Sequence, residues 1–211
     1  MEFQTVIIIL VSSYLIGSIP TAYVIGRLHG KNIFELGSGN MGANNTARVL
    51  GYHWGAAVWV LDGCKGITAM LIARQLVGGD DRSAAMIISA VAAVMGHNWS
   101  IFATLLTGHI RGGKGAATAS GTWVLLVSPV LIAVALISWA AIVALTRYVS
   151  LAVLTIVLLV SLFITATFFF DRGDPIYILY VLVPAMVFYR HRVNIRALLT
   201  GTERRLGERA K

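Results

Sequence analysis

Residues 115–146 read GAATASGTWVLLVSPVLIAVALISWAAIVALT, a run of 32 positions without a charged side chain. A helix crosses the hydrocarbon core of a bilayer with about 20 apolar residues, so this run is long for one span and short for two. Ser128-Pro129 lies near its middle, and proline is a common helix boundary because its ring clashes with the preceding turn. Whether the run forms one span or two decides on which side of the membrane all later residues lie.

The composition of the whole sequence is that of an integral membrane protein. Apolar residues make up 57% of the 211 and charged residues only 12%, whereas about a quarter of a soluble domain is charged. The first apolar segment is too long for the core of a cleavable signal and has no basic residue before it, so we interpret it as a retained span. Besides the run above, membrane helices are expected at 4–26, 54–77, 83–106, 150–170 and 175–190.

The single cysteine, Cys64, excludes an intrachain disulfide and a cysteine-based zinc site. Histidines and carboxylates are not clustered in a pattern typical of a metal site, so neither a metal nor a cofactor is expected. No internal repeat and no soluble domain is visible. We therefore expect one all-α polytopic membrane domain over residues 1–211.

The distribution of basic residues decides the topology. If the run is split at Ser128-Pro129, seven spans place 13 Lys and Arg on the side of the C-terminus and 2 on the other, with Lys65 and Arg74 inside the second span. Without the split the two sides carry 6 and 9. The excess of basic residues on the cytoplasmic side favours the split. The sequence thus predicts seven transmembrane helices, with the N-terminus outside and the C-terminus in the cytoplasm.

The net charge of +8 has the same explanation. In a chain this apolar, basic residues set the orientation in the bilayer, so no nucleic-acid partner is expected. The basic tail after Leu199 is interpreted as a surface segment that touches anionic lipid.

Residues 108–115 read GHIRGGKG, a glycine-rich basic turn between apolar runs. Backbone N–H groups of Gly112 and Gly113, together with Lys114, are typical of a phosphate cradle. The spacing approaches that of a nucleotide P-loop, but Gly115 stands where that loop needs Ser or Thr, and a membrane helix precedes it instead of a strand. Nucleotide binding is therefore disfavoured. The plain structural alternative is two charges that snorkel at a membrane boundary.

Residues 36–48 read LGSGNMGANNTAR and lie in the first loop of the same predicted face. Gly39 permits close approach of a ligand, while Ser38, Asn40 and Asn45 supply neutral hydrogen-bonding groups. Arg48 can bind a phosphate with two hydrogen bonds. The alternative is an ordinary turn with a capping Ser or Asn.

Three further candidates lie on this face. His97 follows a glycine near the end of the third predicted span, Ser150 ends the RYVS segment 147–150, and His191 and Asn194 are three residues apart on one helix face. Taken singly, a histidine bonded to a backbone carbonyl and an interfacial belt of aromatic and basic residues explain them as well.

Asp62 and Lys65 lie inside the second predicted span, three residues apart. Charges within a membrane are costly and usually pair or serve a function. We interpret them as a structural ion pair that lines a polar cavity, in preference to direct catalysis.

All the loop candidates fall on the cytoplasmic face. An enzyme that joins a cytoplasmic solute to a membrane-held lipid needs polar groups on one face only, whereas a transporter places them near the midplane. The pattern favours the enzyme. A small membrane transporter for phosphorylated solutes is the alternative, and a scaffold with lipid-binding loops is a third.

At these motifs the sequence resembles the bacterial acyl-phosphate:glycerol-3-phosphate acyltransferases of the PlsY type, over essentially the whole chain. The motifs that carry the resemblance are, in chain order, 37–45 with Arg48, 61–66, 96–97, 112–115, 147–150 and 190–194. The resemblance implies a seven-helix enzyme of the bacterial inner membrane, with its active site facing the cytoplasm. It would transfer a fatty acyl group from acyl phosphate to the 1-hydroxyl of glycerol 3-phosphate, giving lysophosphatidic acid and phosphate. Its partners would be these two substrates, membrane lipids and the enzyme that makes acyl phosphate.

The resemblance also implies which residues act. By the resemblance, family positions implicated in substrate binding or catalysis are matched by Ser38, Asn40, Arg48, His97, Lys114, His191 and Asn194. We expect catalytic roles for Ser38, Arg48, His97, Lys114, His191 and Asn194. We expect substrate binding by Asn40 and by Gly39, Asn45, Gly112, Gly113 and Ser150, which lie in the same motifs. An acyl phosphate is an activated mixed anhydride, so positioning and charge neutralisation could drive the transfer. We hypothesise that Lys114, Arg48, Ser38 and the glycine amides hold phosphate, and that the histidines and asparagines orient the acceptor or the departing phosphate. The sequence has neither a His-x4-Asp pair nor a Gly-x-Ser-x-Gly motif.

Overall fold

The structure is a computed structural model that describes residues 1–172 and 175–208, with the side chains of Asp171 and Arg172 left out of the description. Among the charges counted above, Arg209 and Lys211 lie outside the described residues. Every regular element of the described part is helical, and one isolated bridge joins Ser100 to Arg111. The elements are α1 (Phe3–Ser18), α2 (Thr21–Leu28), α3 (Ala43–Leu50), α4 (Tyr52–Gln75), α5 (Asp81–Asn98), α6 (Ile101–Thr107), α7 (Ala116–Trp123), α8 (Pro129–Thr146), α9 (Val149–Arg172), the 3₁₀ helix η1 (Pro175–Val181), α10 (Leu182–Arg190) and α11 (Arg192–Leu199).

The long run that opened the sequence analysis is split where the proline predicts it. α7 ends at Trp123 and α8 begins at Pro129, and the Ser128 hydroxyl caps α8 by accepting a hydrogen bond from the Leu131 N–H at 3.3 Å. Proline suits the first position of a helix because its φ is already helical and its missing N–H has no partner to lose. With eight residues α7 is about 12 Å long. It therefore reaches less than halfway through a hydrocarbon core of about 30 Å.

Four helices are long and apolar enough to cross a membrane: Phe3–Leu28, in which α1 and α2 count together, α4, α8 and the Val149–Phe170 part of α9. A fifth is added if Pro175–Arg190 and α11, which are bent by 62° at His191, count as one. The described residues thus form a multi-pass membrane protein with four or five helices of membrane length.

The single helix expected at 83–106 is wrong, because α5 ends at Asn98 and α6 is a separate helix. The break is made by Ser100, whose N–H donates to the Arg111 carbonyl at 2.9 Å and whose hydroxyl bonds to the Ser18 carbonyl. The same hydroxyl accepts from the Ala103 N–H and so caps α6. These partners are distant in sequence, and an apolar run gives no sign of them.

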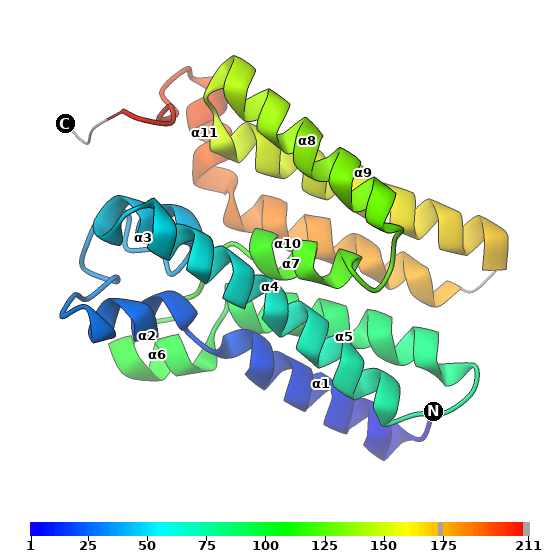
Figure 1. The fold of residues 1–211 in the computed structure, drawn as a ribbon. Helices are drawn as coiled ribbons and strands as arrows, with labels where there is room; N and C mark the ends of the chain where they lie inside the picture. Colours follow the sequence, from blue (N-terminus) through cyan, green and yellow to red (C-terminus); the bar gives the residue numbers. More distant parts are fainter. Residues whose placement is uncertain (173–174, 209–211) are drawn as a thin grey trace.

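The helices form a bundle that is organised around α5 and α4 (Figure 1). α1 and α4 both pack against α5, α3 and α7 pack against α4, and η1 and α10 fill the space between α5 and α9. The largest buried apolar cluster joins α4, α5, α7, α8, α9, η1 and α10, and it includes Tyr180, whose hydroxyl is bonded to that of Thr122. α8 packs on α9 and only 11% of its most apolar stretch is buried, so most of its surface is left for lipid.

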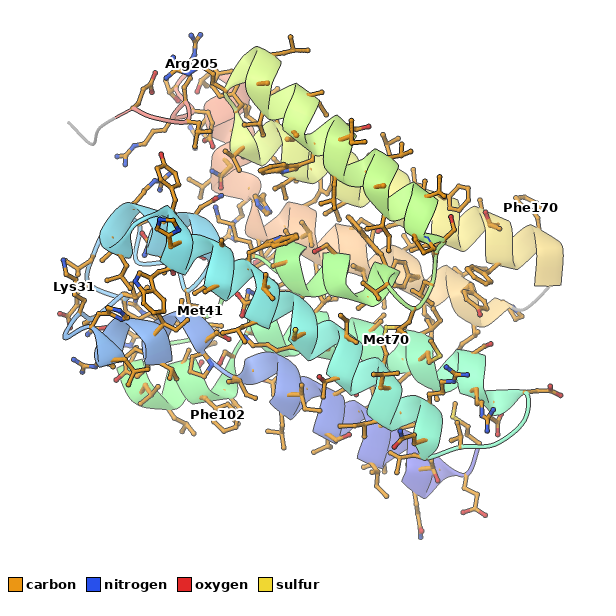
Figure 2. The ribbon with its side chains drawn as sticks, in the orientation of Figure 1. Lys31, Met41, Met70, Phe102, Phe170 and Arg205 are labelled. Atoms are coloured by element: carbon orange, nitrogen blue, oxygen red, sulfur yellow. The ribbon has the colours of Figure 1, made fainter. Side chains whose placement is uncertain are left out.

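The polar connections gather at one end of the bundle. In Figure 1, α2, α3, α6, α11 and the last described residues lie at one end, while the N-terminus and the α4–α5 connection lie at the other. Figure 2 places Lys31 and Arg205 at the first end and Phe170 at the opposite one. At the second end the Met1 amino group pairs with Asp81 at 2.7 Å. The loops that carry the predicted site residues therefore share one end.

Candidate active site

Asn45 determines the shape of the first polar loop. Its side chain is 2% exposed, and its oxygen accepts a hydrogen bond from the Ser38 N–H at 2.7 Å. Its nitrogen donates to the carbonyls of Ile33 at 3.2 Å and Leu36 at 3.1 Å. Because both ends of the amide are bonded inside the protein, Asn45 holds the shape of the loop, and its expected contact with a substrate stays a prediction.

The loop and the glycine turn enclose a cavity between them. The cavity has a volume of about 180 Å³, and its walls come from Ser38, Gly39, Asn40, Ile110, Arg111, Gly112 and Arg190. Three consecutive predicted site residues of the first loop and Gly112 of the glycine turn thus line one space. Gly39 has a φ of +66°, and a β-carbon there would lie 2.9 Å from the Phe34 carbonyl oxygen, so a larger residue would be strained. Arg111 donates to that same oxygen at 3.1 Å and lies over the Phe34 ring.

Arg190 holds the glycine turn from the other side. Its Nε donates to the Gly113 carbonyl at 2.8 Å and its Nη2 to the Gly112 carbonyl at 3.0 Å. The Gly113 N–H donates to the carbonyl of His97 at 2.8 Å. That N–H is therefore already bonded within the protein. The expectation that the N–H groups of both Gly112 and Gly113 are free to bind a phosphate is wrong for Gly113. The turn is held as a rigid platform for the side chain of Lys114.

A chain of hydrogen bonds leads from Lys114 through three residues from later in the sequence, of which only Asn194 contacts the lysine itself. Its Nζ donates to the Asn194 oxygen at 2.5 Å, and the Asn194 nitrogen donates to Glu203 Oε1 at 2.8 Å. The Ser150 hydroxyl donates to the same Glu203 oxygen at 2.6 Å. Lys114, Asn194 and Ser150 are thus brought together as predicted.

Glu203 was missed by the sequence analysis. It lies in the tail that was expected to be a basic surface segment, and a single carboxyl group among basic residues is not a recognisable motif. An acidic residue between basic ones, close behind His191 and Asn194, is the only signal that the sequence offers.

The charges around Lys114 favour an anion. Burial lowers the pKa of Lys114 from its ordinary value, the Glu203 carboxylate raises it, and the charges of Arg48 and Arg190 lower it. Arg48 is exposed on α3 and stands apart from the bonded groups, but its charge reaches Lys114. Three cations thus act on a space with one carboxylate, and a bound phosphate would restore the balance.

The two predicted histidines are both buried at this end of the bundle, with 2% of His97 and 5% of His191 exposed. His191 Nδ1 lies 2.8 Å from the Val187 carbonyl. A carbonyl only accepts, so Nδ1 carries the hydrogen and Nε2 is left as the free position. His97 packs against the glycine turn, since a β-carbon on Gly113 would lie 1.9 Å from its Nε2. Within residues 1–172 and 175–208, no three His, Cys, Asp or Glu side chains are grouped so as to hold a metal ion.

Known proteins have similar sequences and a similar fold. A sequence model of the family described as glycerol-3-phosphate acyltransferase matches residues 7–201. Glycerol-3-phosphate acyltransferase 2 of Moorella thermoacetica is 40% identical over 203 residues, which cover 95% of this chain and 97% of that protein. The glycerol-3-phosphate acyltransferase of Aquifex aeolicus is 38% identical over 199 residues, covering 93% and 97%.

Two solved structures have the same fold. They are crystal structures of PlsY, an integral membrane glycerol 3-phosphate acyltransferase, in its glycerol 3-phosphate form and its lysophosphatidic acid form. Both are 37% identical to this chain, with TM-scores of 0.78 and 0.77, and cover 96% of it, over 96% and 95% of their own lengths. On the match over residues 7–201 and these full-length relatives, the chain belongs to the glycerol-3-phosphate acyltransferase family.

Proposed function

We propose that this chain transfers a fatty acyl group from acyl phosphate to the 1-hydroxyl of glycerol 3-phosphate, forming lysophosphatidic acid and phosphate. The family and the two ligand-bound forms of the PlsY structure support the acceptor and the product. The observation that carries the proposal is the position of Lys114, which is bonded to Asn194 and follows the turn that lines a cavity together with Arg190. Cations in that arrangement suit two substrates that each carry a phosphate.

The proposed reaction needs no nucleophile from the protein. The acceptor hydroxyl attacks the acyl carbonyl, a C–O bond to glycerol forms, and the C–O bond to the donor phosphate breaks. The departing phosphate takes the hydroxyl proton, so the reaction balances without a base from the protein. Lys114, Arg48 and Ser38 would hold phosphate groups, and His97, His191, Asn194 and Asn40 would orient the acceptor or the departing phosphate. Positioning and charge neutralisation of this kind lower a barrier substantially.

We place this site at the cytoplasmic face of the bacterial inner membrane. Seven membrane segments, with the N-terminus outside and the C-terminus in the cytoplasm, put 13 basic residues on that face. In this arrangement α7 enters only partway, and Lys114 lies where α7 begins. Residues 1–211 would form one domain, fed with acyl phosphate by the enzyme that makes it.

The test is an assay with purified protein in detergent. Radiolabelled glycerol 3-phosphate is mixed in parallel with acyl phosphate, acyl-CoA and acyl-carrier protein, and lipid-soluble label is counted. We expect label to enter lipid with acyl phosphate. Transfer from acyl-CoA or acyl-carrier protein alone would overturn the donor assignment. Uptake of label by reconstituted vesicles, with no lipid product from any donor, would favour a transporter instead.

A further inference from the structure

Three ionisable side chains lie buried behind the glycine turn. Asp62 and Lys65 on α4 are 1% and 6% exposed, and His97 on α5 is 2% exposed. Lys65 Nζ is bonded to Asp62 Oδ1 and also donates to the Ile19 carbonyl, in the break between α1 and α2, at 2.5 Å. The ammonium group of Lys65 therefore has two partners, as expected for a structural ion pair. The second carboxylate oxygen of Asp62, Oδ2, takes no part in these bonds.

Two buried atoms in this group lack a hydrogen-bond partner within the described residues. They are Asp62 Oδ2 and His97 Nδ1, and the Nδ1 lies 3.8 Å from Asp62 Oδ1. A carboxylate accepts hydrogen bonds and an imidazole nitrogen that carries hydrogen donates them. The two unpartnered atoms are thus complementary, and a contact between them would satisfy both. Buried polar groups are rarely left unpaired, so this contact is the expected state.

The opposite edge of the His97 ring faces the site. A β-carbon on Gly113 would lie 1.9 Å from His97 Nε2, and the His97 carbonyl accepts the Gly113 N–H at 2.8 Å. Ring and backbone of His97 are therefore both fitted against the turn that carries Lys114. If the hydrogen is on Nδ1, the lone pair of Nε2 is directed at this turn.

We propose that Asp62 is a positioning residue, which holds the hydrogen of His97 on Nδ1 and so presents Nε2 to the glycine turn as a hydrogen-bond acceptor. An acceptor at this place suits the acceptor hydroxyl of glycerol 3-phosphate, and this last step rests on the proposed function. Lys65 balances the charge of Asp62 and ties it to the α1–α2 break. In metal sites and in catalytic triads, a carboxylate bonded to one ring nitrogen fixes the tautomer and the orientation of a functional histidine.

The first test observes the imidazole directly and needs no activity. The protein is labelled with ¹⁵N-histidine, and the His97 signals are assigned among the five histidines by their loss in His97→Gln. We expect His97 to show the Nδ1–H tautomer in the wild type, and a shift toward the Nε2–H tautomer in Asp62→Asn. An Nε2–H tautomer in the wild type, or one that Asp62→Asn does not change, would overturn the proposal. An inactive wild type with the expected tautomers would instead sink the proposed function alone.

The second test separates positioning from charge balance. Asp62→Asn leaves Lys65 without its counter-ion, so its effect alone mixes the two. Asp62→Asn/Lys65→Met removes both charges, and we expect it to regain the melting temperature but to keep a kcat at least about tenfold below the wild type, with KM for glycerol 3-phosphate little changed. Recovery of kcat in the double variant would show that the pair is only structural. Asp81→Asn removes a carboxylate at the far end of α5 and is the matched control, with unchanged kcat expected.

Discussion

At the scale of a single residue, the charge of Lys114 is subject to two opposing influences. Burial and the cations Arg48 and Arg190 disfavour its charge, while Glu203 favours it and Asn194 accepts its hydrogen bond. Without a bound anion, the attraction of Glu203 does not fully offset the burial and the repulsion that lower the pKa of Lys114. A bound anion would therefore favour the charged form of Lys114.

Lys114→Ala is expected to lower kcat/KM by about 10²–10³, as removal of a charge-stabilising donor does in other enzymes. Steady-state transfer to glycerol 3-phosphate measures the loss, and a melting curve in detergent should stay close to that of the wild type. Lys31→Ala, which removes an exposed lysine at the same end of the bundle, is the control and should leave the rate unchanged. Near-normal transfer by Lys114→Ala would refute the phosphate-binding role.

The lowered pKa of Lys114 predicts the pH dependence. Only charged lysine binds phosphate well, so activity is lost as pH rises through this pKa. Because burial lowers the pKa from 10.5, the alkaline limb of kcat/KM, which reports the free enzyme, should lie below that value. In Lys114→Arg the limb should move to higher pH, since arginine stays charged. An alkaline limb unmoved by this change would assign it to another group.

At the scale of an element, the 33–45 loop depends on one amide. Asn45→Ala removes three hydrogen bonds and leaves the Ser38 N–H and two carbonyls without their partner. We expect a loss of about 1–3 kcal/mol in stability and a raised KM for glycerol 3-phosphate, since Ser38 and Gly39 line the cavity. Thermal melting and steady-state kinetics check this. Asn44→Ala changes the exposed neighbour and should have little effect on either measurement.

The C-terminal tail is attached to the site through Glu203. Glu203→Ala leaves Ser150 and Asn194 without their common acceptor, so we expect the melting temperature to fall by several degrees and kcat to fall with it. Glu208→Ala, which removes an exposed carboxylate five residues later, is the matched control. If both variants behave like the wild type, the tail is only a surface anchor, as the sequence analysis first interpreted it.

At the scale of the whole molecule, the seven-segment topology can be tested with cysteines. In a Cys64→Ala background, Lys31→Cys and Arg205→Cys should react with a membrane-impermeant maleimide only in inside-out vesicles. Asp80→Cys, in the connection between α4 and α5, should react only in right-side-out vesicles. Labelling of Lys31→Cys and Asp80→Cys from the same side would contradict the proposed orientation.

Part of the fold could be predicted from the chemistry of neighbouring residues in the sequence. The Ser128-Pro129 break follows from a proline and a capping serine, and the gathering of the loops at one end follows from their charges. The break after Asn98 does not, because the bonds of Ser100 to Ser18 and Arg111 exist only once three segments have packed.

The candidate site, too, could be predicted from the sequence only in part. Lys114 and Asn194 were predictable as polar groups on one face, and their contact agrees with that. The inward role of Asn45 and the place of Glu203 were not predictable, because side-chain direction and tail docking are tertiary properties.

The hydrogen bonds that run from Lys114 to Glu203 have a consequence for biosynthesis. Ribosomes make the chain from its N-terminus, so Lys114 is synthesised 80 residues before Asn194 and 89 before Glu203. A nascent chain that has emerged only as far as α10 has the glycine turn and the first loop, but neither Asn194, which bonds to the lysine, nor Glu203, which bonds to Asn194. The contacts around Lys114 are therefore completed only once the chain has been made as far as Glu203, when α1 to α11 have already been synthesised.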